Sequence, residues 1–208
     1  MLSENLFVIS APSGAGKTTI IKKLTKIRKD IFIPTSYTTR NPRPGEIDKK
    51  DYNFTSHEIF QEMIRDEALV EYAEVYGNFY GTSYEAIINA LNNEPKVLLE
   101  IDCQGAKIIK RRFEFAKLIF IMPPSLNELN QRITHRGQDS SQSIEIRLSQ
   151  AKSEMAQWKD FDYALINQDS DQCLEELLSI IDDLNQDHAT SKPSVVAKME
   201  DAIKTKLY

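Results

Sequence analysis

Residues 6–19 (LFVISAPSGAGKTT) combine an apolar run, a glycine-containing turn and a lysine followed by two threonines. A strand, such a turn and a helix in this order are typical of a loop that binds phosphate groups. Gly14 and Gly16 lack a Cβ, so the backbone can approach an anion and point its N–H groups inward. Lys17 would neutralise the β- and γ-phosphates, and the Thr18 hydroxyl would bind Mg2+.

The predicted phosphate-binding loop departs from the strict pattern at its first position, where Ala11 replaces a glycine. A methyl group is a small addition, so we expect the loop to keep its function. The alternative is a chance glycine-rich turn before a helix. The loop consists of Ala11, Pro12, Ser13, Gly14, Ala15, Gly16, Lys17, Thr18 and Thr19.

A second candidate site is the proline-containing segment TSYTTRNPRPGE, in which Arg40 and Arg43 are three residues apart. A guanidinium group binds phosphate oxygens through two parallel hydrogen bonds, which a point charge cannot do. The two arginines could therefore form a fork for an anion. Since arginines in exposed loops are more often solvated, the segment alone leaves both interpretations open.

Glu71 precedes the aromatic and glycine-rich segment 76–82, which we expect to turn the chain. A carboxylate that faces a pocket can accept hydrogen bonds from two adjacent N–H groups. Guanine presents such a donor pair on its N1 and N2 edge, and adenine does not. Tyrosine hydroxyls can hold a phosphate. On these residues alone, a solvent-facing glutamate beside a tyrosine-rich hairpin is an equally good interpretation.

Three arginines, Arg132, Arg136 and Arg147, surround the polar segment 136–143. Arginines on a mobile helical flap could close over the transferring phosphates and exclude water. Each of them taken singly is better interpreted as a surface charge.

The elements that must position these residues alternate between strands and helices, which predicts a parallel sheet with helices on both faces. The apolar runs at 96–102 and 118–122 predict buried strands. We expect an α/β fold: a P-loop parallel sheet flanked by helices, with an inserted small αβ lobe and a helical lid. The predicted single domain, 1–208, has a core at about 1–34 and 92–187, a lobe at about 35–91, a lid at about 132–158 and a tail at about 188–208.

Bulk composition narrows the function classes. The 208 residues suit one domain. The net charge of −5 argues against non-specific binding of nucleic acid. Two isolated cysteines suit a reducing compartment and suggest no zinc site. The sequence has no predicted signal peptide and no apolar run long enough to span a membrane, so we expect a cytoplasmic protein without a membrane partner. The polar tail is predicted to be a loose helix or partly disordered.

Six segments that together span about 6–184 resemble, in order and spacing, the sequences of bacterial guanylate kinases. Two of them, TTRNPRPGE and the turn GNFYGTS, are far more specific than the phosphate-binding loop. The full set is APSGAGKTT, TTRNPRPGE with Tyr52 soon after it, LVEYAEVYGNFYGTS, LLEIDCQGA, IFIMPPS and the lid RGQDS…IRLSQA.

The resemblance implies a role for individual residues. It implies that GMP is bound by Ser36, Arg40, Arg43, Glu46, Tyr52, Glu71, Tyr80, Thr82 and Asp102. It implies that ATP is bound by the phosphate-binding loop together with Arg132, Arg136 and Asn167. The catalytic residues it implies are Lys17, Arg40, Arg136 and Arg147. Mg2+ would be held by Thr18 and Asp102, largely through water.

The implied reaction transfers the γ-phosphoryl group of MgATP to GMP, and to dGMP as well, giving ADP and GDP. The attacking GMP phosphate oxygen is already anionic at neutral pH, so no general base is required. Catalysis would consist of positioning and charge stabilisation, with the site assembled when both nucleotides close the lobes. The predicted partners are the two nucleotides alone, and the protein is expected to be a monomer or a homodimer.

Two departures from the family pattern are Cys103, where Trp or Met is common, and Gln168, where Asp is frequent. Neither removes a group that the chemistry needs. Three other functions compete: a kinase for another monophosphate, an ATP-hydrolysing switch, and a peptide-binding module of the same fold. The intact Gly14, Gly16 and Lys17 argue against the module, because such modules typically have a degraded loop.

Overall fold

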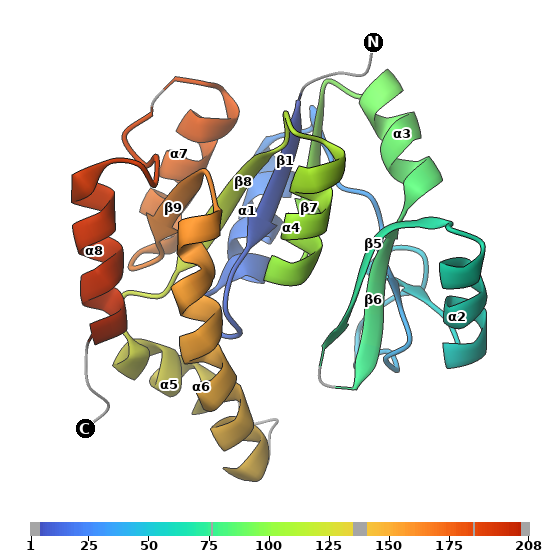
Figure 1. The fold of residues 1–208 in the computed structure, drawn as a ribbon, viewed down its shortest axis with the longest axis horizontal. Coiled ribbons are helices and arrows are strands. Elements are labelled where there is room, and N and C mark those ends of the chain that lie inside the picture. Colours follow the sequence, from blue (N-terminus) through green and yellow to red (C-terminus); the bar gives the residue numbers. More distant parts are fainter. Residues whose placement is uncertain (1–4, 76, 135–140, 185, 205–208) are drawn as a thin grey trace. The chain divides into compact units, whose positions relative to one another are not determined.

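The computed structural model describes residues 5–75, 77–134, 141–184 and 186–204. The chain divides into two compact units (Figure 1). Unit 1 comprises 1–8 and 30–116, and unit 2 comprises 9–29 and 117–208. In the described residues, none of the helices has both the length and the apolar character needed to cross a bilayer.

The larger sheet has five strands and carries the α/β character predicted from the sequence. In spatial order its strands are β2 (Ile31–Phe32), β7 (Lys96–Glu100), β1 (Leu6–Ser10), β8 (Lys117–Met122) and β9 (Tyr163–Ile166). The β2–β7 and β8–β9 pairs are parallel. Every residue of β1 is buried, as are the central residues of β7 and β8, because a strand covered on both faces needs apolar side chains at consecutive positions. The predicted parallel sheet flanked by helices is confirmed.

Unit 1 contains a second, four-stranded sheet. Its strands follow the order β4 (Asn53–Phe54), β3 (Tyr37–Thr38), β6 (Asn78–Ser83) and β5 (Leu69–Val75). The prediction that 77–82 turns the chain was wrong for most of this segment, because 78–83 forms a strand antiparallel to β5. Only Gly77 has the left-handed backbone of a turn, with φ +74°, and pairing with β5 satisfies the backbone polar groups of the rest.

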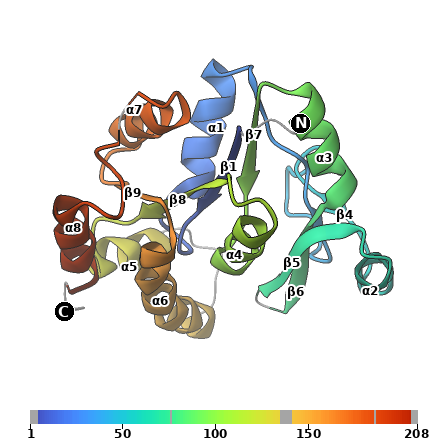
Figure 2. The same cartoon turned by 45° about the horizontal axis from the view of Figure 1, so that its top comes forward.

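Three helices of unit 1 accompany these strands: α2 (His57–Arg65), α3 (Tyr84–Asn93) and α4 (Cys103–Arg112). Ser56 and Ser83 cap α2 and α3, as predicted, by accepting hydrogen bonds from the N–H groups of Ile59 and Ala86. Helix α4 packs against β5, and α3 packs against β5, β6 and β7 (Figure 2). The α2 residue Phe60 stacks on Phe79 of β6 with ring centroids 5.4 Å apart.

Unit 2 contains α1 (Lys17–Ile27), α5 (Leu126–Thr134), α6 (Ser141–Ala156), the 3-10 helix η1 (Gln157–Asp160), α7 (Ser170–Ile181) and α8 (Pro193–Lys204). Helix α7 packs on α1. The ion pair of Arg28 with Asp182 joins the C-terminal ends of these two helices through two hydrogen bonds of 2.7 and 2.9 Å. Helices α1 and α7 are therefore held together at their C-terminal ends.

The C-terminal tail was predicted to be a loose helix or partly disordered, and its described residues contain a helix that is packed on the rest of unit 2. Helix α8 buries Val195, Met199 and Ala202, which lie three or four residues apart and so share one face. This face packs against α6 and β9. The preceding segment is also fixed, because the Thr190 hydroxyl donates to the Phe161 carbonyl at 2.6 Å. Apolar residues at helical spacing thus outweigh the polar composition of the tail.

Candidate functional site

The phosphate-binding loop of unit 2 takes the bent conformation that its glycines predict. Gly14 and Gly16 have φ +90° and +96°, and residues that carry a Cβ rarely adopt such angles. The Ala15 N–H donates to the Pro12 carbonyl at 3.1 Å, which closes the loop on itself. Helix α1 begins immediately afterwards at Lys17, so the positive end of its dipole points toward any anion in the loop.

Neighbouring side chains of unit 2 also exclude a Cβ from both glycines. A Cβ on Gly14 would lie 2.8 Å from Ile133 Cγ1 and 2.9 Å from Leu129 Cδ1, both on α5. A Cβ on Gly16 would collide with the side-chain amide of Asn167. These positions therefore require glycine for two reasons, backbone conformation and lack of space.

Asn167 and Arg132 support the phosphate-binding loop through hydrogen bonds to its backbone. The buried Asn167 amide donates to the Ala15 carbonyl at 2.6 Å. The Arg132 guanidinium donates to the Asn167 carbonyl at 3.1 Å and to the Ala15 carbonyl at 3.4 Å, and its Nε donates to Glu128 at 3.0 Å. The resemblance implied that both residues contact ATP, and the structure adds that both support the loop itself.

A cavity of about 420 Å³ opens beside this network, within the size range of small-molecule sites. One of its lining residues, Asp169, caps α7 by accepting the N–H groups of Asp171 and Gln172 at 2.9 Å each. The hydrogen bonds from Gln172 and Asp171 lower the pKa of the Asp169 carboxyl. The cavity is lined by Gly14, Gly16, Thr19, Arg132, Asn167, Gln168, Asp169 and Ser170.

One contact of the loop was not predicted from the sequence. The Ser13 N–H donates to the Glu154 carboxylate of α6 at 3.1 Å. The two residues are 141 positions apart, and Glu154 occurs in an ordinary helical stretch, so no local signal could have identified it. One backbone N–H group of the loop that is predicted to bind phosphate is therefore already hydrogen-bonded to a carboxylate.

In unit 1, Arg40 is fixed by partners on several sides. Its Nη2 donates to Glu46 Oε1 at 2.9 Å and its Nη1 donates to the Asn41 carbonyl at 2.6 Å. The guanidinium lies 5.5 Å from the Tyr52 ring centre, a cation–π distance. Burial lowers the Arg40 pKa, but hydrogen bonds to Glu46 and Tyr80 outweigh it, and the net pKa is raised. Arg40 is therefore a permanently charged side chain that is held in a fixed orientation.

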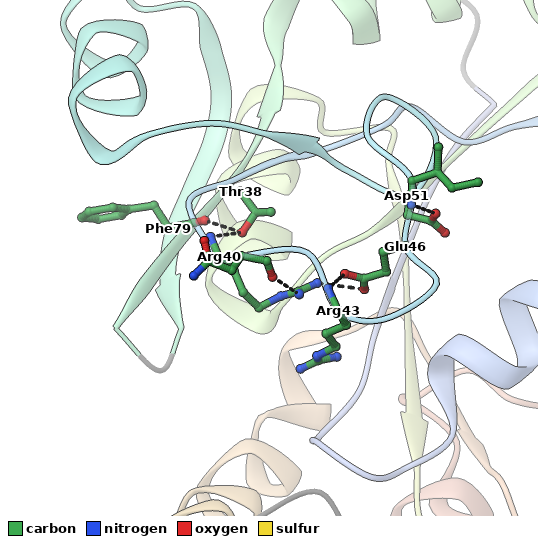
Figure 3. Close-up of polar contacts among 8 residues, drawn as sticks. Thr38, Arg40, Arg43, Glu46, Asp51 and Phe79 are labelled. Carbon is green, nitrogen blue, oxygen red and sulfur yellow. Dashed lines mark hydrogen bonds and ion pairs between the residues drawn. The ribbon is translucent and has the colours of Figure 1, made fainter.

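Glu46 joins Arg40 and Arg43 by accepting a hydrogen bond from each of them, as Figure 3 shows. Its second oxygen accepts the backbone N–H of Arg43 at 2.7 Å. Burial raises the Glu46 pKa, and the bonds from Arg40 and Arg43 lower it by more, so that the carboxylate stays ionised. The Arg43 side chain is exposed and extends away from Glu46 (Figure 3). The two guanidinium groups are thus held differently, one clamped and one extended into solvent.

Thr38 ties Arg40 to strand β6. Its hydroxyl donates to the Phe79 carbonyl at 3.0 Å and accepts the Arg40 N–H at 3.2 Å (Figure 3). The following loop is stiffened by Asp51, which accepts the Ile47 N–H at 2.8 Å. These bonds hold the arginine segment beside the strand that contains Tyr80.

Tyr52 and Tyr80 meet edge to face beside Arg40, with ring centroids 6.0 Å apart. Burial raises the pKa of the Tyr52 hydroxyl to about 12, and the negative charge of Glu100 adds to the effect. The hydroxyl is therefore a neutral hydrogen-bond donor at physiological pH. The structure thus brings together Arg40, Glu46, Tyr52 and Tyr80, which come from three separate segments.

A second polar group of unit 1 centres on Glu71 of β5. Its side chain is nearly inaccessible, with 4% exposure, and so is that of Thr82, with 1%. The Thr82 hydroxyl donates to Glu71 Oε1 at 2.6 Å, and the Ser36 hydroxyl lies 3.5 Å from the Thr82 hydroxyl. The solvent-facing alternative for Glu71 is therefore excluded, because its buried carboxylate accepts the Thr82 hydroxyl, beside which the Ser36 hydroxyl lies.

Asp102 stands at the end of β7, as the resemblance implied, and caps α4. Its Oδ1 accepts the Gly105 N–H at 2.8 Å, and its Oδ2 accepts Gln104 Nε2 at 3.3 Å. The neighbouring Cys103 is buried. Within the described part of the chain, no three His, Cys, Asp or Glu side chains gather in a metal-binding cluster.

The remaining predicted residues lie in unit 2. Lys17 is partly buried and Thr18 is exposed, both in the first turn of α1. Arg136 lies outside the described residues. Arg147 falls on α6, but its side chain is likewise outside what the structure describes.

Comparison with known proteins identifies close relatives of this chain. The family model described as guanylate kinase matches residues 3–184. The guanylate kinase of Shewanella denitrificans is 49% identical over 178 residues, covering 85% of this chain and 86% of the relative. That of Escherichia coli K12 is 45% identical over 183 residues, covering 87% and 88%. A crystal structure of guanylate kinase from Anaplasma phagocytophilum superimposes with a TM-score of 0.73 at 27% identity, covering 99% and 97%.

Proposed function

Because the chain belongs to the guanylate kinase family and transfers a phosphoryl group from ATP to GMP, we propose that unit 1 binds GMP and unit 2 binds MgATP. Each unit supplies the groups that its nucleotide needs. The observation that supports the assignment most strongly is the buried Glu71 carboxylate, which accepts the Thr82 hydroxyl at 2.6 Å. A buried carboxylate in such a position selects a base with paired N–H donors.

In unit 1, Glu71 accepts the N1 and N2 hydrogens of guanine, with Thr82 and Ser36 completing the base site. The GMP phosphate is held by Arg40 and Arg43. Tyr52 and Tyr80 donate hydroxyl hydrogen bonds to the same phosphate, which the high pKa of Tyr52 supports. Glu46 positions the arginine segment, and Asp102 lies at the GMP end of the sheet. The lobe that does this work is 35–91, within unit 1.

In unit 2, the loop from Ala11 to Thr19 wraps the ATP phosphates, and Lys17 neutralises them. Arg132 and Asn167 line the cavity for the rest of the nucleotide. We assign Arg136 and Arg147, which the sequence resemblance implies to be part of a lid at 132–158, to the ATP phosphates. Asn167 has a second role as a support for the loop, through its bond to Ala15.

The donor set suits Mg2+ that arrives with ATP. Kinases hold this ion through one or two side chains, water and phosphate oxygens, and the exposed Thr18 hydroxyl beside Lys17 is such a side chain. Asp102 would contribute through water. When bound, the ion neutralises the charge that develops on the phosphates.

The chemistry requires no proton transfer by the protein. The attacking oxygen of GMP is anionic at neutral pH, so the task is to bring two polyanions into line. Lys17, Arg40, Arg136 and Arg147 supply the positive charge that stabilises the transition state. We extend the substrate range to dGMP, because the side chains that we assign to GMP contact its base and its phosphate, which dGMP shares. We place the reaction in the cytoplasm, where the thiols of Cys103 and Cys173 would stay reduced.

Titration calorimetry with each nucleotide alone tests the assignment of GMP to unit 1 and of ATP to unit 2. Arg43→Ala is expected to weaken GMP binding at least tenfold and to leave ATP binding within twofold, because its guanidinium contacts only the monophosphate. Lys17→Ala should do the reverse and abolish turnover. Weakening of both nucleotides to the same degree in either variant would refute the assignment of one substrate to each unit.

A further inference from the structure

The first turn of helix α4 touches the carboxylate of Glu71. A Cβ placed on Gly105 would lie 2.5 Å from Glu71 Oε2 and 3.2 Å from Glu71 Cδ. A separation of 2.5 Å is closer than any side-chain carbon can approach an oxygen. The carboxylate therefore occupies space that is available only because residue 105 is a glycine.

The opposite oxygen of the same carboxylate is held by a side chain. Thr82 donates its hydroxyl to Glu71 Oε1 at 2.6 Å. With 4% exposure, the Glu71 side chain is nearly enclosed by protein. The carboxylate thus lies between the Thr82 hydroxyl and the first turn of α4, where residue 105 has no side chain.

The turn itself is anchored. The Gly105 N–H donates to Asp102 Oδ1 at 2.8 Å, and α4 packs along β5, the strand that contains Glu71. A substituent on Gly105 is therefore relieved by movement of the Glu71 side chain and not by movement of the helix. Since alanine also favours a helix over glycine, such a variant changes the orientation of the carboxylate without a penalty in helix formation.

We infer that Gly105 is a specificity-determining residue, because its missing side chain sets the orientation in which Glu71 reads two N–H donors of the substrate base. The inference rests on the proposed role of Glu71 in guanine recognition. Gly105 contacts no substrate in this account, and it acts as a positioning residue. A rotated carboxylate would still accept one hydrogen bond but would lose the second.

Inosine monophosphate distinguishes the two bonds, because it keeps the N1 hydrogen and lacks the 2-amino group. The readout is the ratio of kcat/KM for GMP to kcat/KM for inosine monophosphate. We expect Gly105→Ala to lower this ratio about tenfold, the value of one charge-assisted hydrogen bond. The KM for ATP should stay within twofold. A variant that only destabilised the fold would lower both rates together and keep the ratio.

Three further variants complete the test. Ala106→Gly, on the next residue of α4, weakens the helix without adding atoms near Glu71, and it should keep the ratio. Glu71→Gln should lower the ratio as strongly as Gly105→Ala. Glu71→Asp shortens the side chain, so adding Gly105→Ala to it should change the ratio less than twofold. If Gly105→Ala alone fails to fold, recovery of folding in that double variant supports the clash, and failure of both overturns it.

Two outcomes separate the inference from the function on which it rests. An unchanged ratio in folded Gly105→Ala, with a reduced ratio in Glu71→Gln, would overturn the role of Gly105 and leave guanine recognition by Glu71 intact. An unmodified protein that uses both monophosphates equally well would overturn the role of Glu71 and, with it, the inference.

Discussion

The side-chain amide of Asn167 donates to the main-chain carbonyl of Ala15 at 2.6 Å, across 152 residues of sequence. This bond joins the end of β9 to the centre of the phosphate-binding loop. The donor is buried and the acceptor belongs to a backbone bent by two glycines. The shape of the loop therefore depends on a residue far from it in the chain.

Removal of this bond should weaken ATP binding. In Asn167→Ala the Ala15 carbonyl loses a buried donor, which costs about 1–3 kcal/mol, and the loop loses its fixed shape. We expect the KM for ATP to rise about tenfold while the KM for GMP stays within twofold. Steady-state kinetics with each substrate varied in turn measures both. The exposed Asn93→Ala on α3 is the matched control, and equal effects of both variants would contradict the role of Asn167.

Substitution of Gly16 also tests the packing of the phosphate-binding loop against Asn167. Gly16→Ala imposes a Cβ at φ +96° and against Asn167. We expect a loss of about 1–3 kcal/mol in the free energy of unfolding and no measurable ATP binding by calorimetry. GMP binding should persist at temperatures where the variant is folded. An ATP affinity near that of the unmodified protein would show that the bent backbone is not required.

Glu46 should act on GMP through Arg40. Glu46→Gln removes the charge that pairs with the guanidinium at 2.9 Å, so Arg40 gains freedom that GMP binding must then remove. We expect the KM for GMP to rise about tenfold with little change in kcat. Glu62→Gln breaks an exposed pair with Arg65 at 3.8 Å and serves as the control. A normal KM for GMP in Glu46→Gln would mean that Arg40 needs no partner.

The raised pKa of Tyr52 predicts that the protein loses stability at alkaline pH. Its pKa rises from 10.0 to about 12 on folding, so the neutral hydroxyl is favoured in the folded state. The resulting stabilisation is complete below pH 10 and is lost as the pH approaches 12, by up to about 2 kcal/mol. Cys173, whose pKa rises from 9.0 to about 12, adds a similar loss that begins one unit lower.

Urea unfolding at several alkaline pH values checks this prediction. The slope between pH 10 and 12 should be shallower in Tyr52→Phe than in the unmodified protein, whereas the exposed Tyr72→Phe should keep it. Identical slopes in all three proteins would contradict the burial of the Tyr52 hydroxyl.

Helix α8 should be part of the stable core. Met199 is 2% exposed, so Met199→Ala is expected to lower the free energy of unfolding by about 2–5 kcal/mol. Activity at low temperature should be unchanged, because α8 supplies no site residue. The neighbouring exposed Lys198→Ala should be neutral in chemical denaturation. A neutral Met199→Ala would favour the loose tail that the sequence composition predicted.

Local signals explain what could be predicted from the sequence. The apolar runs identified β7 and β8, serines identified the starts of α2 and α3, and the glycine spacing identified the phosphate-binding loop. These features depend on a few adjacent residues. Segment 77–82 was predicted to be a turn because it is rich in turn-forming residues, but pairing with strand β5 provides the hydrogen bonds that make 78–83 a strand.

The site was less predictable where it depends on long-range packing. Arg40 and Arg43 were predicted to form a fork for an anion, and no signal in the sequence indicated that Glu46 holds the side chain of Arg40 but only the backbone of Arg43. Glu154 had no signal at all, because its contact with Ser13 arises from the placement of α6. The position of Gly105 against Glu71 likewise follows from the packing of α4 on β5.

The most direct test of the central claim is ADP release by the purified protein with MgATP and each of GMP, AMP, CMP and UMP in turn. Guanine recognition by Glu71 and phosphate recognition by Arg40 and Arg43 predict rapid turnover with GMP and background rates with the other three. Rapid turnover with another monophosphate would contradict the base assignment. No turnover with any of the four, by folded protein that still binds GMP, would contradict the enzymatic function and favour a binding module.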